Sequence, residues 1–258
     1  MVNTVIKASF SLYNQYPRSN RKYIKENNNV LDLVLFGTNL TSTVGYPKYT
    51  IILQHMVVLP NYIKDVIIGL LLSDGWMQKQ SSKGHARISF KQSFERAEYL
   101  LFVFIILSHY CKSYPKLGYA KLNNKIYPFF TFTTRSLLCF TDIFHTFYVN
   151  GKKVVPEDIY NILTIQGLAH WICGDGSFVK GGGLYLNTQS FTIIDNVRLI
   201  NVLILKFNCK CSIHMQRGLP IIYISARSMR KLLPLLEPYF TPGMLYKLRK
   251  EKKRKEKN

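Results

Sequence analysis

An internal duplication is the strongest constraint on how this chain folds, and its period is roughly 95 residues. Four short matches recur in the same order: Asp-Gly at 74–75 and 175–176, Gln-Ser-Phe at 92–94 and 189–191, Arg-Ser-Leu/Met at 135–137 and 227–229, and Gly at 151 and 243. One such match is trivial, but four in register are not expected by chance. The duplication therefore predicts two half-domains of the same fold.

The hydrophobic pattern is the same in both halves. Periodic apolar segments predict helices at 62–73, 95–111 and 136–147, and again at 164–173, 194–208 and 228–239. Alternating segments such as 86–92 and 210–216 predict strands between these helices. The expected order is αββαββα, twice, which is an α+β fold of two pseudo-symmetric halves. The predicted boundaries are an arm at 1–60, halves at 61–155 and 156–248, and a basic tail at 249–258.

The alternating strands each predict one apolar and one polar, cation-rich face. Alternation alone selects six residues for contact with a base or a phosphate: Arg87, Lys91, Arg135, Lys210, His214 and Gln216.

The formal net charge is +21, and the last ten residues hold seven basic and two acidic side chains. The rest of the chain therefore carries 21 − 5 = +16, which favours a polyanionic partner. Nucleic acid is the leading candidate and an anionic membrane surface is the second. The five cysteines contain no CxxC pair, which argues against a disulfide framework or a structural zinc site. The first 25 residues are basic without an acid, as in transit peptides.

Two aspartates stand apart from the other acidic residues. Asp74 and Asp175 each follow an apolar helix, and the dipole at a helix C-terminus disfavours negative charge. Each carboxylate therefore needs a compensating cation, for which a lysine would serve. A divalent metal would serve better if the two carboxylates converge.

The segments 67–75 (IIGLLLSDG) and 168–176 (LAHWICGDG) resemble the two motifs of the LAGLIDADG homing endonucleases, in the branch with both motifs in one chain. Segments 186–191, 220–224 and 244–248 resemble the same branch. The second motif departs from the pattern, because His170 replaces a glycine of the helix contact and Cys173 replaces the first acid. Leu72 replaces that acid in the first motif. The metal-carrying position is Asp in both copies.

This resemblance implies a monomer whose two sheets form β-saddles for DNA binding. It also implies that the protein binds a long asymmetric DNA site and cuts both strands, leaving 3′ overhangs. It implies that Asp74 and Asp175 hold Mg²⁺, or another divalent cation such as Mn²⁺, against the scissile phosphates. The supporting residues that it implies are Gln92 and Gln189 for the attacking water and Lys153 and Lys247 for developing charge, with Lys152 as an alternative to Lys153. It also implies a role in intron mobility and a mitochondrial setting.

Other interpretations stay open. The same fold could serve an intron RNA-binding splicing maturase or a catalytically inactive DNA-binding regulator, and a membrane-surface protein is a more distant alternative. Singly, each aspartate would more often be structural. The lysines could simply be solvated or touch phosphate, and the glutamines could be hydrogen bonders at strand ends. His170 is expected to be packed and hydrogen-bonded rather than a ligand.

Overall fold

The computed structural model describes residues 41–248. Most of the predicted arm, including the transit-like first 25 residues, and the whole basic tail lie outside the described residues. Within the described residues, none of the helices has the length and apolar character that crossing a membrane requires.

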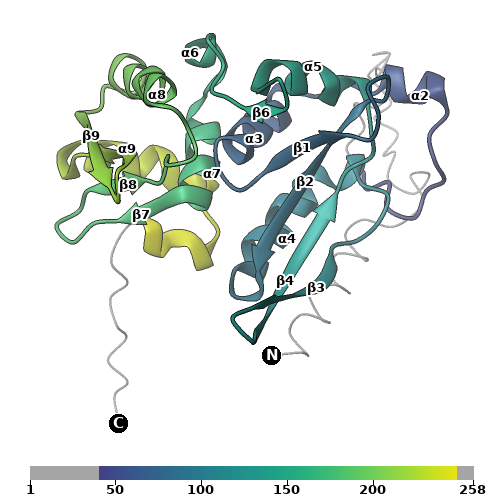
Figure 1. The fold of residues 1–258 in the computed structure, drawn as a ribbon, viewed down its shortest axis with the longest axis horizontal. Helices are drawn as coiled ribbons and strands as arrows, with labels where there is room; N and C mark the ends of the chain where they lie inside the picture. The colour runs from purple at the N-terminus through teal and green to yellow at the C-terminus, as the bar shows by residue number, and fades with distance from the viewer. Residues whose placement is uncertain (1–40, 249–258) are drawn as a thin grey trace, which may run out of the picture. The chain divides into compact units, whose positions relative to one another are not determined.

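The predicted order αββαββα occurs twice, so the expected fold class is confirmed (Figure 1). The first set is α3 (Asn61–Leu71), β1 (Trp76–Lys79), β2 (Ala86–Ser93), α4 (Ala97–Leu107), β3 (Lys116–Leu122), β4 (Lys125–Thr133) and α5 (Leu138–Phe147). The second set is α7 (Ile165–Asp175), β7 (Gly176–Phe178), β8 (Leu184–Leu186), α8 (Ile193–Leu205), β9 (Cys211–Gln216), β10 (Leu219–Ile224) and α9 (Ala226–Leu236).

Shorter elements connect the two sets. They are α2 (Ile51–Met56), the pair β5 (Tyr148–Val149) and β6 (Lys152–Lys153), α6 (Ile159–Ile162), and the 3₁₀ turns Phe94–Arg96, Ser108–Tyr110, Glu237–Tyr239 and Pro242–Lys247. The two larger sheets have equivalent strand orders, β1-β2-β4-β3 and β7-β8-β10-β9. The strand pairs β2·β4, β3·β4, β7·β8, β8·β10 and β9·β10 are antiparallel.

The described chain divides into two compact units, each held together by its own internal packing. The first contains the described residues up to Ile63 and Met77–Asp142, and the second contains Lys64–Trp76 and the residues from Ile143 onward. The first motif helix, α3, thus packs mainly within the unit that also contains the second motif helix, α7. The halves 61–155 and 156–248 are defined by the sequence repeat, and their boundary stays a prediction.

In the first unit, α4 packs on β2 and β4 through aromatic side chains. The rings of Phe90 and Tyr99 lie 5.9 Å apart, and those of Phe104 and Phe132 lie 5.5 Å apart. The predicted alternation in 86–92 is present, because the side chains expected to face the core are buried, while Arg87 is half-buried and Lys91 is exposed.

One residue of that strand departs from the alternation. Ser89 was expected on the polar face, but it is 2% exposed. Its hydroxyl lies 3.0 Å from that of Thr133 on the neighbouring strand β4, and this hydrogen bond compensates for its burial.

The alternation predicted for 210–216 is only partly correct. Ile213 and Met215 were expected on a buried face, but they are 36% and 59% exposed. The physical reason is that β9 is the edge strand of its sheet, with only β10 as a partner in that sheet, so one side of the strand has no neighbour.

The end of the predicted arm is more ordered than the sequence suggests. Residues 51–56 form helix α2, whose N-cap Thr50 accepts a hydrogen bond from the backbone N–H of Leu53. The hydroxyl of Thr43 donates to the carbonyls of His109 and Cys111, so the stretch before α2 is attached to the first unit. The predicted arm at 1–60 therefore contains a regular element, helix α2.

Candidate functional site

Glycines allow the helices α3 and α7 to approach very closely. A Cβ added at Gly69 would overlap the backbone oxygen of Gly167 and lie 2.6 Å from the Cβ of His170. A Cβ added at Gly174 would overlap the side chain of Ser73. Because real Cβ atoms do not tolerate such distances, the close contact between the helices depends on glycine at both positions, 69 and 174.

His170, which replaces a motif glycine, does not keep the helices apart. Its Cβ lies opposite Gly69, so the glycine of the first motif makes room for the larger residue of the second. His170 is 1% exposed, and burial lowers its pKa to about 4. The expected packing of His170 is confirmed, while its expected hydrogen bonding stays a prediction.

The two aspartates stand at the ends of these helices. Asp175 is the last residue of α7 and is half-buried, while Asp74 lies in the turn after α3 and is exposed. Ser73, the residue before Asp74, packs against Gly174, the residue before Asp175. The close helix contact therefore brings the backbones that carry the two carboxylates together.

The glycine after each aspartate has a different role from a left-handed helix cap. Gly176 caps α7 at φ −70°, and Gly75 is not among the glycines with positive φ. A Cβ at Gly75 would lie 2.8 Å from the carbonyl oxygen of Leu70, and one at Gly176 would lie 2.5 Å from that of Ile172. Glycine is needed here because the chain turns back against the helix end.

Lys153 lies beside both aspartates. Its ammonium group donates to the backbone carbonyls of Ser73 at 2.9 Å and Gly75 at 3.1 Å, on either side of Asp74. Burial lowers the pKa of Lys153, and the negative charges of Asp175 and then Asp74 oppose that shift. Lys152 is exposed on the same short strand, so the structure places Lys153 and not Lys152 at this point.

Lys247 has the equivalent place next to the second motif. It lies in a 3₁₀ turn, is 3% exposed, and donates to the backbone carbonyl of Gly174, directly before Asp175. Both lysines predicted from the sequence thus contact the backbone that carries a motif aspartate.

The two predicted glutamines are placed differently. The side-chain amide of Gln189 donates to the oxygen of Gln216 at 2.9 Å. Gln92 is 5% exposed on β2, in the first unit.

Asn187 is a site residue that the sequence reasoning missed. Its side-chain amide donates to the backbone carbonyl of Asp175 at 2.7 Å, so it holds the end of α7. Its place in the segment 186–191, which resembles the family, was the one signal that could have found it.

The carboxylates of Asp74 and Asp175 are oxygen donors, as magnesium and similar hard cations prefer. Over the part of the chain that the structure describes, no cluster of three or more His, Cys, Asp or Glu side chains could hold a metal ion. A divalent ion at these carboxylates would therefore take its remaining ligands from water, backbone oxygen or phosphate. Magnesium is commonly bound in this way, by one or two carboxylates together with a substrate phosphate.

The second sheet has an aromatic cluster on one face. The ring of His214 is stacked on that of Tyr223 at 5.2 Å, and the ring of Tyr185 lies 5.6 Å from His214. The Tyr185 hydroxyl and the Ser212 hydroxyl contact the two ring nitrogens of His214. His214 is thus held in one orientation on the face where the alternation placed it.

Arg135 does not lie on the polar face that the alternation predicted. It is 8% exposed, and its guanidinium donates to the backbone carbonyls of Pro47, Thr43 and Tyr46. The guanidinium carbon also lies 4.2 Å from the ring centroid of Tyr49. Arg135 thus attaches the segment before α2, and the expectation that it lies on an open polar face is wrong; its contact with DNA stays a prediction.

Lys91 keeps the position that the alternation predicted in the first unit. It is exposed on β2, and its ammonium group lies 4.9 Å from the centroid of the Phe129 ring. The charge therefore remains accessible to a partner on the polar face of the sheet.

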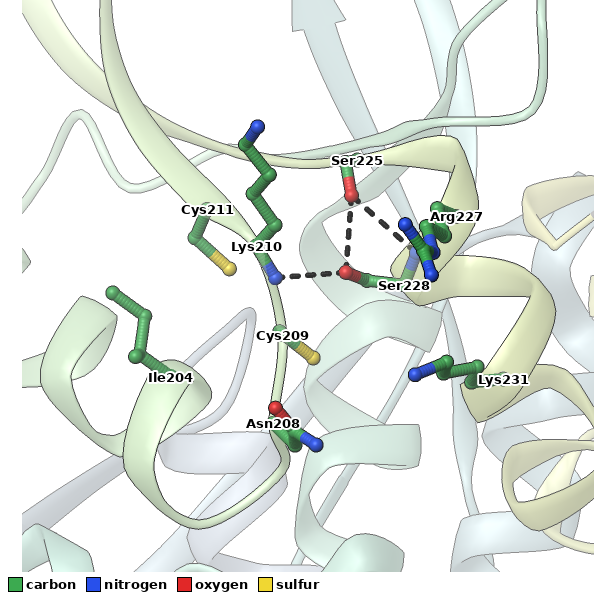
Figure 2. Close-up of a pocket in the computed structure, with 9 residues that line it drawn as sticks. All are labelled: Ile204, Asn208, Cys209, Lys210, Cys211, Ser225, Arg227, Ser228 and Lys231. Atoms are coloured by element: carbon green, nitrogen blue, oxygen red, sulfur yellow. Dashed lines mark hydrogen bonds between the residues drawn. The ribbon is translucent and has the colours of Figure 1, made fainter.

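Lys210 precedes β9 and borders a pocket of about 420 Å³ in the second unit (Figure 2). Its backbone N–H donates to the Ser228 hydroxyl at 2.7 Å, and its side chain extends away from Cys209. The pocket is also lined by Cys211, and neither motif aspartate is part of its lining. All five cysteines are free, as the sequence predicted.

Both motif helices lie within a match to a known protein family. A family model described as "LAGLIDADG DNA endonuclease family" matches residues 64–232, which is more than half of the chain. The chain belongs to this family. The match includes both aspartates and both larger sheets, while Lys247 and the segment before residue 64 lie outside it.

Named relatives include both an endonuclease, as the resemblance implied, and a maturase, which was the alternative interpretation. The chain is 34% identical over 190 residues to "Cytochrome b mRNA maturase bI2" of Debaryomyces hansenii, covering 71% of this chain and 72% of the relative. It is 29% identical over 229 residues to "Probable intron-encoded endonuclease 1" of Wickerhamomyces canadensis, covering 85% and 95%. Among solved structures, the homing endonuclease I-WcaI bound to its DNA recognition sequence matches with a TM-score of 0.71 and 28% identity, covering 75% of this chain and 88% of that chain.

Proposed function

We propose that this protein is a site-specific endonuclease that hydrolyses both strands of duplex DNA at a long asymmetric site. The observation that carries this proposal is the contact between the ends of α3 and α7, where Asp74 and Asp175 come together beside Lys153. A purely structural pair of carboxylates would not need two glycine-dependent helix contacts or two lysines bonded to the adjoining backbone. Two carboxylates and two cations suit the binding and cleavage of phosphodiesters.

The chain's own residues divide the work between holding charge and positioning the substrate. A divalent cation such as Mg²⁺, held by Asp74 and Asp175, would supply positive charge at the scissile phosphates and lower the pKa of an attacking water. Lys153 and Lys247 hold positive charge at fixed points near each aspartate, where it can stabilise negative charge that develops on the phosphate.

Gln92 and Gln189 are the proposed residues for orienting the attacking water. Each carries an amide that can both donate and accept a hydrogen bond, as positioning a water requires. Gln189 would release Gln216 to do so, because its amide is bonded to that side chain in the free protein.

The polar faces of the two sheets are the proposed DNA-binding surfaces. Arg87 and Lys91 supply cations on the first sheet, and His214 with its aromatic neighbours presents flat, polar rings on the second. Lys210 and Gln216 complete the proposed contacts of the second sheet. Because these groups differ between the sheets, one chain can read two different half-sites, so a monomer suffices and the target need not be palindromic.

A homing role fits the relatives that are named as intron-encoded endonucleases. By resemblance to the family, cleavage would leave 3′ overhangs and promote copying of an intron into an allele that lacks it. We infer the mitochondrial setting from the same resemblance, and the relatives named for cytochrome b mRNA fit it.

The decisive experiment selects cleaved sequences from a randomised duplex library with Mg²⁺ present and then repeats cleavage of the selected site with variants. We expect Asp175→Asn and Asp74→Asn to lose double-strand cleavage while binding the duplex normally in Ca²⁺. The matched control is Asp158→Asn, which removes an exposed carboxylate elsewhere in the second unit. Normal cutting by both site variants would remove these carboxylates from the mechanism. Binding without cutting by the wild-type protein would favour the inactive regulator.

A second function, intron RNA splicing, is favoured by the 34% identity to a protein named as an mRNA maturase. The two functions are compatible on one chain. Splicing of the host intron with and without the protein separates them, and the Asp175→Asn variant shows whether any splicing activity depends on the cleavage site.

A further inference from the structure

Arg135 attaches a short stretch of chain, residues 41–57, to the first unit just beyond the end of β4. Its guanidinium donates to three backbone carbonyls of this segment at 2.9 to 3.1 Å, and the ring of Tyr49 lies over it. A second anchor joins the carbonyl of Thr41 to His109 at 2.8 Å. The segment is therefore part of the surface of the first unit, and it lies outside the residues that match the family model.

A hollow of about 560 Å³ lies where this segment meets the sheet. Four cationic side chains line it. Arg135 is bonded to the carbonyls of the segment, and the other three are Lys48 from the segment, Arg87 from β2, and Lys112 from the turn before β3. Lys48 and Lys112 are exposed, and Arg87 is half-buried. The hollow has no acidic residue in its lining, and none of its four cations forms an ion pair within the described residues.

The hollow continues the polar face of the first sheet. Arg87 and Thr133 both line it, and Thr133 is the strand partner of Ser89 on that face. The buried residues Ile88 and Phe90 point to the opposite face, where α4 packs. A duplex lying along the polar face would therefore extend toward the hollow.

We propose that this hollow binds a backbone phosphate of the DNA, and that residues 41–57 lengthen the DNA-contacting surface beyond the sheet. Four cations in one concavity repel each other, and a phosphodiester relieves that repulsion while releasing its condensed counterions. The neutral hydrogen-bonding groups of the lining, Gln54, Gln80 and His85, can also donate to a phosphate oxygen. The inference rests on the proposed function, because it assigns a further contact to the same DNA.

The test compares two duplexes that contain the selected target, one with a long flank and one trimmed on the side read by the first sheet. Binding is measured in Ca²⁺ at several salt concentrations. The variant is Lys48→Ala/Lys112→Ala, which leaves Arg87 and the motif residues intact. Its matched control is Arg230→Ala/Lys231→Ala, which removes the same charge from exposed positions on α9 in the other unit.

We expect the Lys48/Lys112 variant to bind the long duplex several-fold more weakly, with the slope of log affinity against log salt reduced by about 1. On the trimmed duplex the variant should bind as tightly as the wild type. On the long duplex, ethylation of phosphates in one flank should interfere with binding by the wild type but not with binding by the variant. An equal loss of affinity on both duplexes, or a loss no larger than that of the control variant, contradicts phosphate binding in the hollow. Either result leaves the proposed function standing. A wild-type protein that binds neither duplex overturns both.

Discussion

The ammonium group of Lys247 donates a hydrogen bond to the backbone carbonyl of Gly174, the residue directly before Asp175. Lys153 makes the corresponding bond to Ser73, directly before Asp74. The two lysines come from unrelated local structures, a 3₁₀ turn and a two-residue strand. Each motif helix thus has one lysine ammonium group at its end, where the dipole leaves the carbonyl oxygens partly negative.

Replacing Lys153 tests whether this cation takes part in catalysis. We expect Lys153→Met to reduce the cleavage rate about 100-fold, because a fixed positive charge near the phosphate is lost while the aliphatic stem is kept. Single-turnover cleavage with saturating protein is the measurement, and binding in Ca²⁺ should change little. Lys152→Met removes the exposed neighbour and should cut at the wild-type rate. Equal rates for the two variants would contradict the role of Lys153.

The packing of Gly174 against Ser73 leads to a test of the helix contact. Gly174→Ala introduces a methyl group into the position of the Ser73 side chain, and we expect a loss of about 2 kcal/mol in the free energy of unfolding. Urea unfolding measures this change. Adding Ser73→Gly removes the overlapping atoms and should restore much of the stability, beyond the effect of Ser73→Gly alone. If the double variant shows the sum of the two single losses, the two residues do not interact.

The fold is predictable because its information is local and repeated. Short-range pattern fixes the positions of the motif aspartates, the apolar helices and the alternation in 86–92. The structure has these features as expected, apart from the buried Ser89. Asp74 and Asp175 could be selected because they occur at matching places in a duplicated motif, and Lys153 and Lys247 because of the resemblance to the family.

What could not be predicted depends on contacts between distant segments. Arg135 alternates like a surface cation, but three carbonyls of residues 43–47 take up its guanidinium. The exposure of Ile213 and Met215 follows from the edge position of β9, which alternation does not reveal. The hydrogen bond between the side chains of Gln189 and Gln216 joins two residues that are distant in the sequence, so no spacing in the sequence indicates it.

Burial of His170 makes the stability of the second unit depend on pH. Its pKa is about 4 in the folded protein and near 6.5 in the unfolded chain, so the unfolded chain binds more protons between these values. The contribution is fully present above pH 6.5 and is lost as the pH falls, reaching a loss of about 2 kcal/mol at pH 5. Urea unfolding at pH 7 and pH 5 measures it. His170→Asn should reduce this pH dependence, whereas His145→Gln, at an exposed histidine of α5, should keep it.

Arg135→Gln tests the attachment of residues 41–57 to the first unit. The substitution removes a buried cation that bonds to three carbonyls, and we expect the free energy of unfolding to fall by roughly 3 kcal/mol. Because these carbonyls belong to one short segment, that segment should be the first to detach. Limited proteolysis under native conditions should therefore cut the variant between residues 41 and 50 much faster than the wild type. Lys121→Gln loses the same charge from an exposed site on β3 and should show neither effect. Faster cutting spread evenly over the whole chain would instead indicate global unfolding, and the specific attachment by Arg135 would then be rejected.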